Sequence, residues 1–350
     1  MIANFIKKVI SFRQFPKEIS LEVTGRCNLN CQFCFNKAYI RERDVAKTLS
    51  TQQIKVIIDK ISDSPASIVR FTGGEPLLRE DIIDLMRYAQ EKGLEVWLNT
   101  NATLIGAEKA KAIAKYAKNV LVSLNSYDLA TESQISGDNV FKRKLKGIKY
   151  LQKFKVPYIR CGTVASKENI MNLGKIFSLV KRLKISNWEI FREMPLSGQD
   201  SNVKREDITE LVDKLIRINE CEDKRYLVTN AIPFCASDPK KVSKVAIGAI
   251  EDDGHSRFTI DFLGRGKPMY YLDEFLGDIF RTNISKMWQT KFMRDMRNLK
   301  FIPDVCKRCQ YVQTCKGGSR SAAKALYGDY TKADPLAQPD FVESARYHKL

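Results

Sequence analysis

Residues 19–35 read ISLEVTGRCNLNCQFCF, a short apolar strand pattern that leads directly into a loop with three cysteines. Cys27, Cys31 and Cys34 are spaced as C-x3-C-x2-C, an arrangement that nine cysteines scattered over 350 residues would seldom produce. Three thiolates in one tight loop suit a cubane iron–sulfur cluster whose fourth iron stays open to an external ligand. A structural zinc site is the alternative, but it needs a fourth ligand, and the first histidine of the chain is His255.

Alternating strand and helix patterns continue outward from this stretch through the first two-thirds of the chain. Six such units predict a parallel sheet with right-handed crossovers, which is a partial (βα)6 barrel of TIM-like type. Because a closed barrel needs eight units, we expect one side to be open to a large substrate. The expected strands are 19–25, 67–73, 95–101, 119–125, 158–165 and 188–194. The expected helices are 51–62, 80–92, 107–118, 140–153, 170–183 and 206–220.

The pattern changes after residue 220, where short strand-like pieces are broken by turns. One helix is expected over 285–298, followed by the last three cysteines. We predict an amphipathic segment over 1–18, the barrel over 19–222, and a small α+β domain over 223–350.

The ends and the charge of the chain restrict its partners. No apolar run is long enough to span a membrane, and residues 1–17 lack the features of a secretory signal, so we expect a cytoplasmic protein. Residues 1–13 form either a helix that packs on the barrel or one that rests on an anionic membrane surface. The net charge is +18, and residues 281–332 hold twelve Lys and Arg against three Asp. That stretch is either a solvated face or a docking site for an acidic substrate, and nucleic acid is disfavoured because no recognised binding motif accompanies it.

The loop CNLNCQFC at 27–34 and the sequence GGEP at 73–76 together resemble the radical S-adenosylmethionine (SAM) superfamily. The resemblance implies that Cys27, Cys31 and Cys34 hold a [4Fe-4S] cluster and that its open iron binds SAM. Reductive cleavage of SAM would then yield a 5′-deoxyadenosyl radical that abstracts hydrogen from the substrate. It also implies an external reductant such as ferredoxin or flavodoxin.

The same resemblance implies further contacts with SAM. The GGEP loop places glycine backbone near a ligand, and we expect its carbonyls and a carboxylate to face the SAM ammonium group. Phe33, just before the last cysteine, is expected near the adenine. Ser123 matches a serine that relatives carry near the SAM carboxylate or ribose, whereas Asn125 stands where they often have aspartate. Arg160 is expected to pair with the SAM carboxylate, with Arg143 as its competitor. The four residues of the loop are Gly73, Gly74, Glu75 and Pro76.

The second cysteine group, C-x2-C-x5-C at Cys306, Cys309 and Cys315, resembles the SPASM extension of radical SAM peptide and protein maturases. Several cysteines of that pattern are missing, because Ser319, Met269 and the residues after Asp334-Pro335 stand in their places. We therefore expect a degenerate, SPASM or twitch-like domain with at most one auxiliary iron–sulfur cluster. The fourth ligand is left open among Cys235, Asp329, Asp334 and a substrate group. A four-thiolate zinc site with Cys235 is the alternative.

Three hypotheses of function follow. The first is a radical SAM enzyme that modifies an acidic peptide or protein side chain. The second keeps the chemistry and changes the substrate to a small molecule, tetrapyrrole or lipid. The third is a non-catalytic iron–sulfur electron-transfer or scaffold protein. Cys161 and Cys221 are expected to be bystanders, and the sequence identifies no catalytic acid or base.

Overall fold

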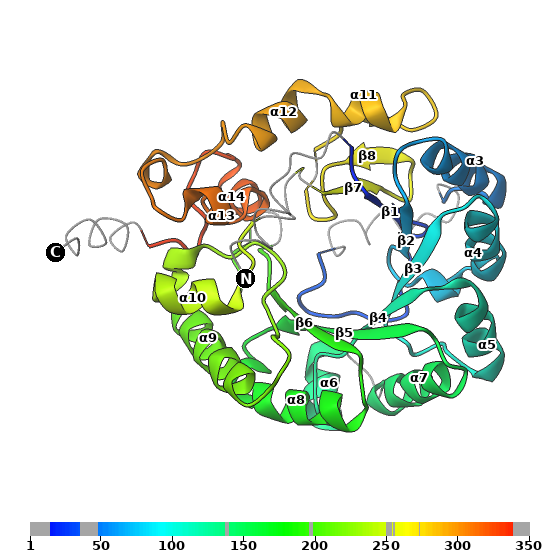
Figure 1. Ribbon diagram of the computed structural model, residues 1–350, viewed down its shortest axis with the longest axis horizontal. Helices are drawn as coiled ribbons and strands as arrows, with labels where there is room; N and C mark the ends of the chain where they lie inside the picture. The colour runs from blue at the N-terminus through cyan, green and yellow to red at the C-terminus, as the bar shows by residue number, and fades with distance from the viewer. Residues whose placement is uncertain are drawn as a thin grey trace.

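The computed structural model describes residues 15–35, 48–136, 140–195, 199–249, 254, 256–272 and 274–338. A single nine-stranded sheet with the order β6-β5-β4-β3-β2-β1-β7-β8-β9 curves around the centre of the molecule, with helices on its outside (Figure 1). The strands are β1 (Glu18–Glu22), β2 (Ile68–Thr72), β3 (Glu95–Thr100), β4 (Asn119–Ser123), β5 (Tyr158–Ala165), β6 (Asn187–Arg192), β7 (Arg257–Ile260), β8 (Arg265–Lys267) and β9 (Gly277–Asp278). Neighbouring strands from β6 through β1 to β7 are parallel, and β8 and β9 are antiparallel.

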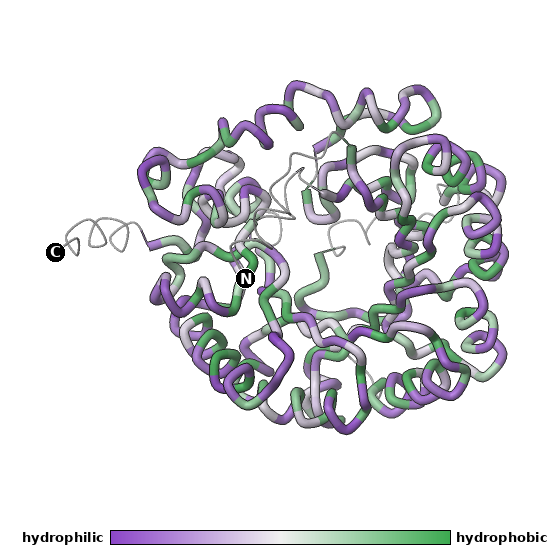
Figure 2. The backbone as a smooth tube through the Cα atoms, in the orientation of Figure 1, coloured by the Kyte–Doolittle hydropathy of each residue, from purple (hydrophilic) through white to green (hydrophobic). Residues whose placement is uncertain are grey.

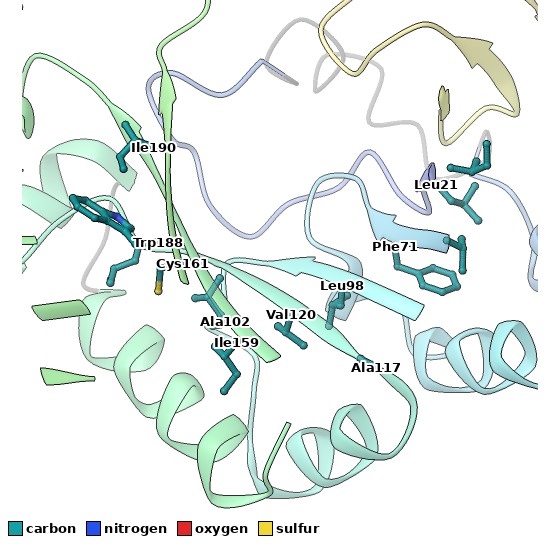
Figure 3. Close-up of a cluster of buried hydrophobic side chains, with 14 of the residues drawn as sticks. Leu21, Phe71, Leu98, Ala102, Ala117, Val120, Ile159, Cys161, Trp188 and Ile190 are labelled. Carbon is teal, nitrogen blue, oxygen red and sulfur yellow. The ribbon is translucent and has the colours of Figure 1, made fainter. Parts of the chain in front are cut away.

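Helices cover the outer face of the six-stranded barrel part and contribute its core. The helices there are α3 (Thr51–Ser62), α4 (Ile82–Glu91), α5 (Ala107–Tyr116), α6 (Leu129–Ser136), α7 (Phe141–Lys153), α8 (Leu173–Arg182) and α9 (Arg205–Glu220). The helix α3 is an example. Ser50 and Gln53 form a capping box at its start, and its buried isoleucines lie on one face that packs into the core. Figure 2 shows hydrophilic residues around the outer ring of the molecule, and Figure 3 shows outward-facing strand residues such as Leu98 and Val120 in the buried core.

The remaining chain forms a smaller region that arcs from the β8 side back towards α10 (Figure 1). Its helices are α10 (Pro239–Val245), α11 (Ile284–Trp288), α12 (Lys291–Arg297), α13 (Val312–Cys315) and α14 (Arg320–Tyr327). Short 3-10 helices are η2 (Pro76–Leu78), η3 (Ile170–Asn172), η4 (Phe234–Ala236) and η5 (Asp304–Cys306).

The partial barrel predicted from the sequence is confirmed, and its strands differ from the expected bounds only at their ends. Two details were wrong or missed. The single helix expected over 285–298 is two helices, because the Thr290 side chain accepts a hydrogen bond from the Met293 amide and starts α12 afresh. The short helix α6 was not expected, and it proves important for the site. One sheet runs across residue 222, because β7 pairs directly with β1.

Candidate active site

The loop with Cys27, Cys31 and Cys34 follows β1 at the carboxyl ends of the parallel strands, where barrel enzymes place their active sites. All three thiols are partly exposed. Burial raises the pKa of Cys27, although the Leu29 amide donates a hydrogen bond to its sulfur at 3.4 Å. Three partly exposed thiols in one loop match the donor set of an iron–sulfur cluster with an open iron.

The GGEP loop lies directly against the cysteine loop. The Gly74 amide donates to the Thr24 carbonyl at 2.8 Å, and the Glu75 amide donates to the Arg26 carbonyl at 2.8 Å. A Cβ on Gly73 would meet the Thr24 oxygen at 2.3 Å, and one on Gly74 would meet the Arg26 oxygen at 2.0 Å. Both glycines are therefore required by the close approach of two backbones, before any ligand is considered.

The Glu75 side chain turns inward instead of facing the loop mouth. It is buried, and it accepts hydrogen bonds from the Thr100 hydroxyl at 2.8 Å, the Asn101 amide at 2.7 Å and the Leu77 amide at 3.1 Å. Burial raises its pKa, while these hydrogen bonds oppose the rise. Through these contacts Glu75 ties the end of β3 to the GGEP loop.

Asparagine and threonine side chains from the loop after β3 also hold the cysteine loop. The side-chain Nδ2 of Asn101 donates to Asn28 Oδ1 at 2.9 Å, and the side-chain Nδ2 of Asn28 donates to the Thr103 hydroxyl at 2.9 Å. Asn101 Nδ2 also lies 4.0 Å from the Cys27 sulfur. The sequence pattern does not bring these residues together, because the contacts join segments more than 70 residues apart.

The other residues predicted to contact SAM differ in how deeply they are buried. Phe33 is partly exposed in the cysteine loop, and Ser123 is partly exposed at the end of β4, so both remain at the mouth. Asn125 is buried, and its Oδ1 accepts from the Val164 amide at 2.9 Å, so it joins the ends of β4 and β5.

Arg160 does not lie at the mouth. It is the third residue of β5, about 16 Å of strand before Ala165 at the carboxyl end. Its guanidinium donates to Asn119 Oδ1 at 2.8 Å, forms an ion pair with Glu189 and stacks on Trp97 at 5.1 Å. These partners occupy the inner wall near the amino ends of the strands, so Arg160 is left out of the SAM site.

A second charged group lies inside the barrel at the carboxyl end of β1. Glu22 is buried, and its Oε1 has no hydrogen-bond partner among the described residues. Burial raises its pKa to about 7, and the charge of Asp261 on β7's end adds to the rise, while Lys267 and Arg265 oppose it. The sequence had elevated no acid or base here, because it did not place β7 next to β1.

The second cysteine group closes around η4, η5 and α13. The Phe234 amide donates to the Cys315 sulfur at 3.4 Å, and the Gln338 amide donates to the Cys235 sulfur at 3.3 Å. Burial raises the pKa of Cys306 to about 11 and that of Cys315 to about 12, and the neighbouring thiols, Cys235 among them, add to both rises. The four cysteines therefore lie near enough to influence one another electrostatically, and they are Cys235, Cys306, Cys309 and Cys315.

The carboxylates weighed as fourth ligands have other partners. Asp334 forms an ion pair with Arg192 at 2.8 Å, and both side chains are almost completely buried. Asp334 also accepts from the Ser319 amide at 2.7 Å, and Ser319 itself caps α14. Asp329 accepts from the Thr331 amide at 2.8 Å on the surface. Of the candidates, the thiol of Cys235 is the one placed among the other cysteines.

Within the described residues, no group of three or more His, Cys, Asp or Glu side chains is arranged to hold a single metal ion. A single ion needs ligands that converge on one point, whereas in a cubane each thiolate binds a different iron atom. No helix in the described part of the chain has the length and apolar character needed to cross a membrane. The amphipathic segment 1–13 lies outside the described residues.

The model of the radical SAM superfamily matches residues 21–180, the part that contains both the cysteine loop and GGEP. The chain belongs to the radical SAM superfamily. It is 25% identical to an AdoMet-dependent heme synthase of Nitratidesulfovibrio vulgaris over 91% of each chain. It is 24% identical to a PqqA peptide cyclase of Bradyrhizobium diazoefficiens over 91% of this chain and 85% of that protein.

The fold also matches solved structures. SuiB of Streptococcus suis, bound to S-adenosylmethionine, superposes with a TM-score of 0.75 at 19% identity, covering 96% of this chain and 81% of SuiB. This protein is therefore a radical SAM enzyme with a [4Fe-4S] cluster and SAM as cofactors, and the non-catalytic alternative is set aside.

Proposed function

We propose that Cys27, Cys31 and Cys34 ligate the catalytic cluster and that SAM lies over the GGEP backbone at the carboxyl ends of the strands. When bound, these cofactors supply the one-electron cleavage that generates a hydrogen-abstracting radical. The chain's own residues position that chemistry: Gly73 and Gly74 permit the close approach, and Asn101 braces the loop. Phe33 and Ser123 line the mouth in this proposal, whereas Glu75, Pro76 and Asn125 support it from behind.

We propose that one auxiliary iron–sulfur cluster binds Cys306, Cys309, Cys315 and Cys235. The supporting observation is the mutual influence of these thiols, together with the commitment of Asp334 to Arg192. A four-thiolate zinc site is the competing occupant. We also keep the division into 1–18, 19–222 and 223–350 as a proposal, with the second cysteine group in the third part.

We propose a peptide or protein side chain, borne on an acidic segment, as the substrate. The observation that carries this proposal is the cationic surface of residues 281–332, which include α11 to α14. Two of the twelve cations there are structural, because Arg297 stacks on Trp288 and Arg320 donates to backbone carbonyls. The others are mostly exposed, among them Lys307, Arg308 and Lys324. One solved SuiB structure, at TM-score 0.76, holds its precursor peptide SuiA.

A binding experiment tests this substrate class. We expect a glutamate-rich synthetic peptide to bind with an affinity that falls steeply with salt, whereas a lysine-rich peptide does not bind. The variant Lys307→Glu/Arg308→Glu/Lys324→Glu should lose most of that affinity. The matched control reverses three exposed lysines of α7, Lys142, Lys146 and Lys149, and should leave binding unchanged. Equal loss in both variants would mean that overall charge, not this surface, governs binding.

A second substrate class, an iron porphyrin, is favoured by the similarity to the heme synthase. It predicts a shift of the porphyrin absorption band when an iron porphyrin is titrated into the enzyme, at a stoichiometry of one. The peptide proposal predicts no saturable shift. A lipid substrate instead predicts flotation with anionic liposomes that is lost when residues 1–13 are removed.

A further inference from the structure

Glu132 of α6 and Lys144 of α7 form an ion pair that is sealed beneath the cysteine loop. Their Oε1 and Nζ atoms lie 2.5 Å apart, and each side chain is only 1% exposed. Burying two charges costs several kcal/mol for each ion, and apolar pairs of similar size often serve stability equally well. The pair therefore calls for an explanation beyond stability.

The carboxylate of Glu132 gathers three hydrogen-bond donors. Besides Lys144, it accepts from the hydroxyl of Ser126 at 2.6 Å and from the hydroxyl of Ser136 at 2.6 Å. Burial acts to raise the pKa of Glu132, but the charge of Lys144 and these hydrogen bonds hold it below its usual range. Glu132 is thus ionised and accepts from both hydroxyls.

The last turn of α6 supports the part of the loop around Cys31. The Gln32 amide donates to the Ile135 carbonyl at 3.0 Å, and the Gln32 side chain donates to the Gln134 carbonyl at 2.6 Å. The Asn30 amide approaches the Ser136 carbonyl at 3.5 Å. A helix leaves its last carbonyls without partners inside the helix, and here the loop supplies them. Cys31 therefore lies on the end of α6.

Ser136 connects this support to the ligand sulfur. Its hydroxyl oxygen is 3.5 Å from the Cys31 sulfur, and its only hydroxyl hydrogen is donated to Glu132. A thiolate ligand has no hydrogen of its own to donate, so the contact leaves the sulfur without a hydrogen bond from Ser136. Hydrogen bonds to cluster sulfurs help to set the reduction potential, and a donor stabilises the more electron-rich reduced state.

We propose that the Glu132–Lys144 pair is a positioning device for the Cys31 ligand, which fixes α6 under the loop and holds the Ser136 hydroxyl hydrogen away from the ligand sulfur. The proposal rests on the proposed ligation of the cluster by Cys31. Its consequence is a lower reduction potential, and therefore a stronger reductant for the cleavage of SAM. Glu132, Lys144 and Ser136 act through Cys31 and are positioning residues.

The test is a potentiometric titration of the reconstituted full-length enzyme, in which the catalytic cluster is recognised by the change of its electron paramagnetic resonance signal with SAM. The variant Glu132→Met/Lys144→Met removes both charges and frees the Ser136 hydroxyl. We expect its midpoint potential to rise by about 59 mV, which is a tenfold change in the equilibrium constant of a one-electron couple. Adding Ser136→Ala should return the potential to that of the wild type, and Ser136→Ala alone should not move it.

The outcomes separate this inference from the proposed function. An unchanged potential in the double variant, or a rise that persists in the triple variant, would overturn the inference while iron content and the SAM response remain normal. A wild-type enzyme without a SAM-sensitive signal would instead refute the proposed function. If the double variant does not fold, Glu132→Leu/Lys144→Leu asks the same question without leaving a buried charge unpaired, and Ser136→Ala should again cancel the rise. No rise in this variant would again overturn the inference.

Discussion

The cysteines after β1 lie in a partly exposed loop at the mouth of the barrel, whereas Cys306 and Cys315 are buried in a small region between η5 and α13. The first loop is braced by side chains and carbonyls from β3 and α6, and it presents three thiols. The second group gathers four cysteines, and its nearest carboxylate is held by an arginine. An open three-thiol site suits chemistry on a bound ligand, while a closed four-thiol site suits electron transfer or structural support.

Removing ligands from each group gives the largest expected effects. Cys31→Ala should abolish formation of 5′-deoxyadenosine from SAM under reducing, anaerobic conditions, because two thiolates do not hold the cluster. Cys309→Ala should leave measurable cleavage of SAM while it removes the second group's iron. Product analysis by liquid chromatography, with iron measured on the same samples, checks both. If SAM cleavage survived in the Cys31 variant, the assignment of the two sites would be wrong.

Breaking the Arg192–Asp334 pair tests how the second group depends on the barrel. Arg192→Ala leaves the buried Asp334 without its counter-charge and should lower the free energy of unfolding by roughly 3–5 kcal/mol. Arg205→Ala is the control, because this arginine is exposed and its side chain donates to the Ala337 carbonyl at 2.7 Å without a buried counter-charge. Denaturant titrations should show a change in the control of less than about 1 kcal/mol. An equal change in the free energy of unfolding in both variants would show that the buried pair of Arg192 and Asp334 contributes nothing beyond an ordinary surface contact.

The buried Glu22 makes stability depend on pH. Its pKa of about 7 lies above its ordinary value of 4.5, so the folded state binds more protons than the unfolded state between these values. Stability should therefore decrease as pH rises from about 4.5 to 7, by roughly 2–3 kcal/mol from this group. Glu22→Gln should flatten the decrease and stabilise the protein above pH 7. The measurement is the free energy of unfolding at several pH values. The same pH dependence in wild type and variant would contradict this prediction.

Gly74→Ala tests the contact between the GGEP loop and the cysteine loop. The added Cβ would clash with the Arg26 carbonyl. We therefore expect the free energy of unfolding to fall by about 1–3 kcal/mol and the catalytic cluster to be retained less well. Gly106→Ala is the matched control, because a Cβ there meets no atom within 4 Å. Cluster loss during gel filtration can be followed by absorbance. If both variants lost the cluster to the same extent, the contact between the two loops would not be what retains it.

The smallest effect is expected at the bystander cysteines. Cys221 is exposed at the end of α9, and Cys161 is buried in β5 with its pKa raised by burial to about 12. Cys221→Ser should leave iron content, SAM cleavage and stability unchanged within error. A loss of iron in this variant would show that the second group recruits its fourth ligand from outside η4.

Local pattern made the barrel and the cysteine spacing predictable, because periodicity and short-range spacing are properties of contiguous sequence. The errors concern contacts between distant segments. Arg160 occupies an acceptable strand position, but the sequence does not reveal that Glu189 and Asn119 face it. The pair of Glu132 and Lys144 could not be predicted either. Glu132 lies on a short helix with little hydrophobic periodicity and belongs to no recognisable motif.

We propose that this one chain holds two iron–sulfur clusters, one at the barrel mouth and one at the four-cysteine group. The most direct measurement is iron, sulfide and zinc per chain in anaerobically purified and reconstituted enzyme. Two clusters would give about eight iron and eight sulfide per chain with no zinc, falling to about four iron when Cys309 is replaced. About four iron together with one zinc in the wild type would contradict it.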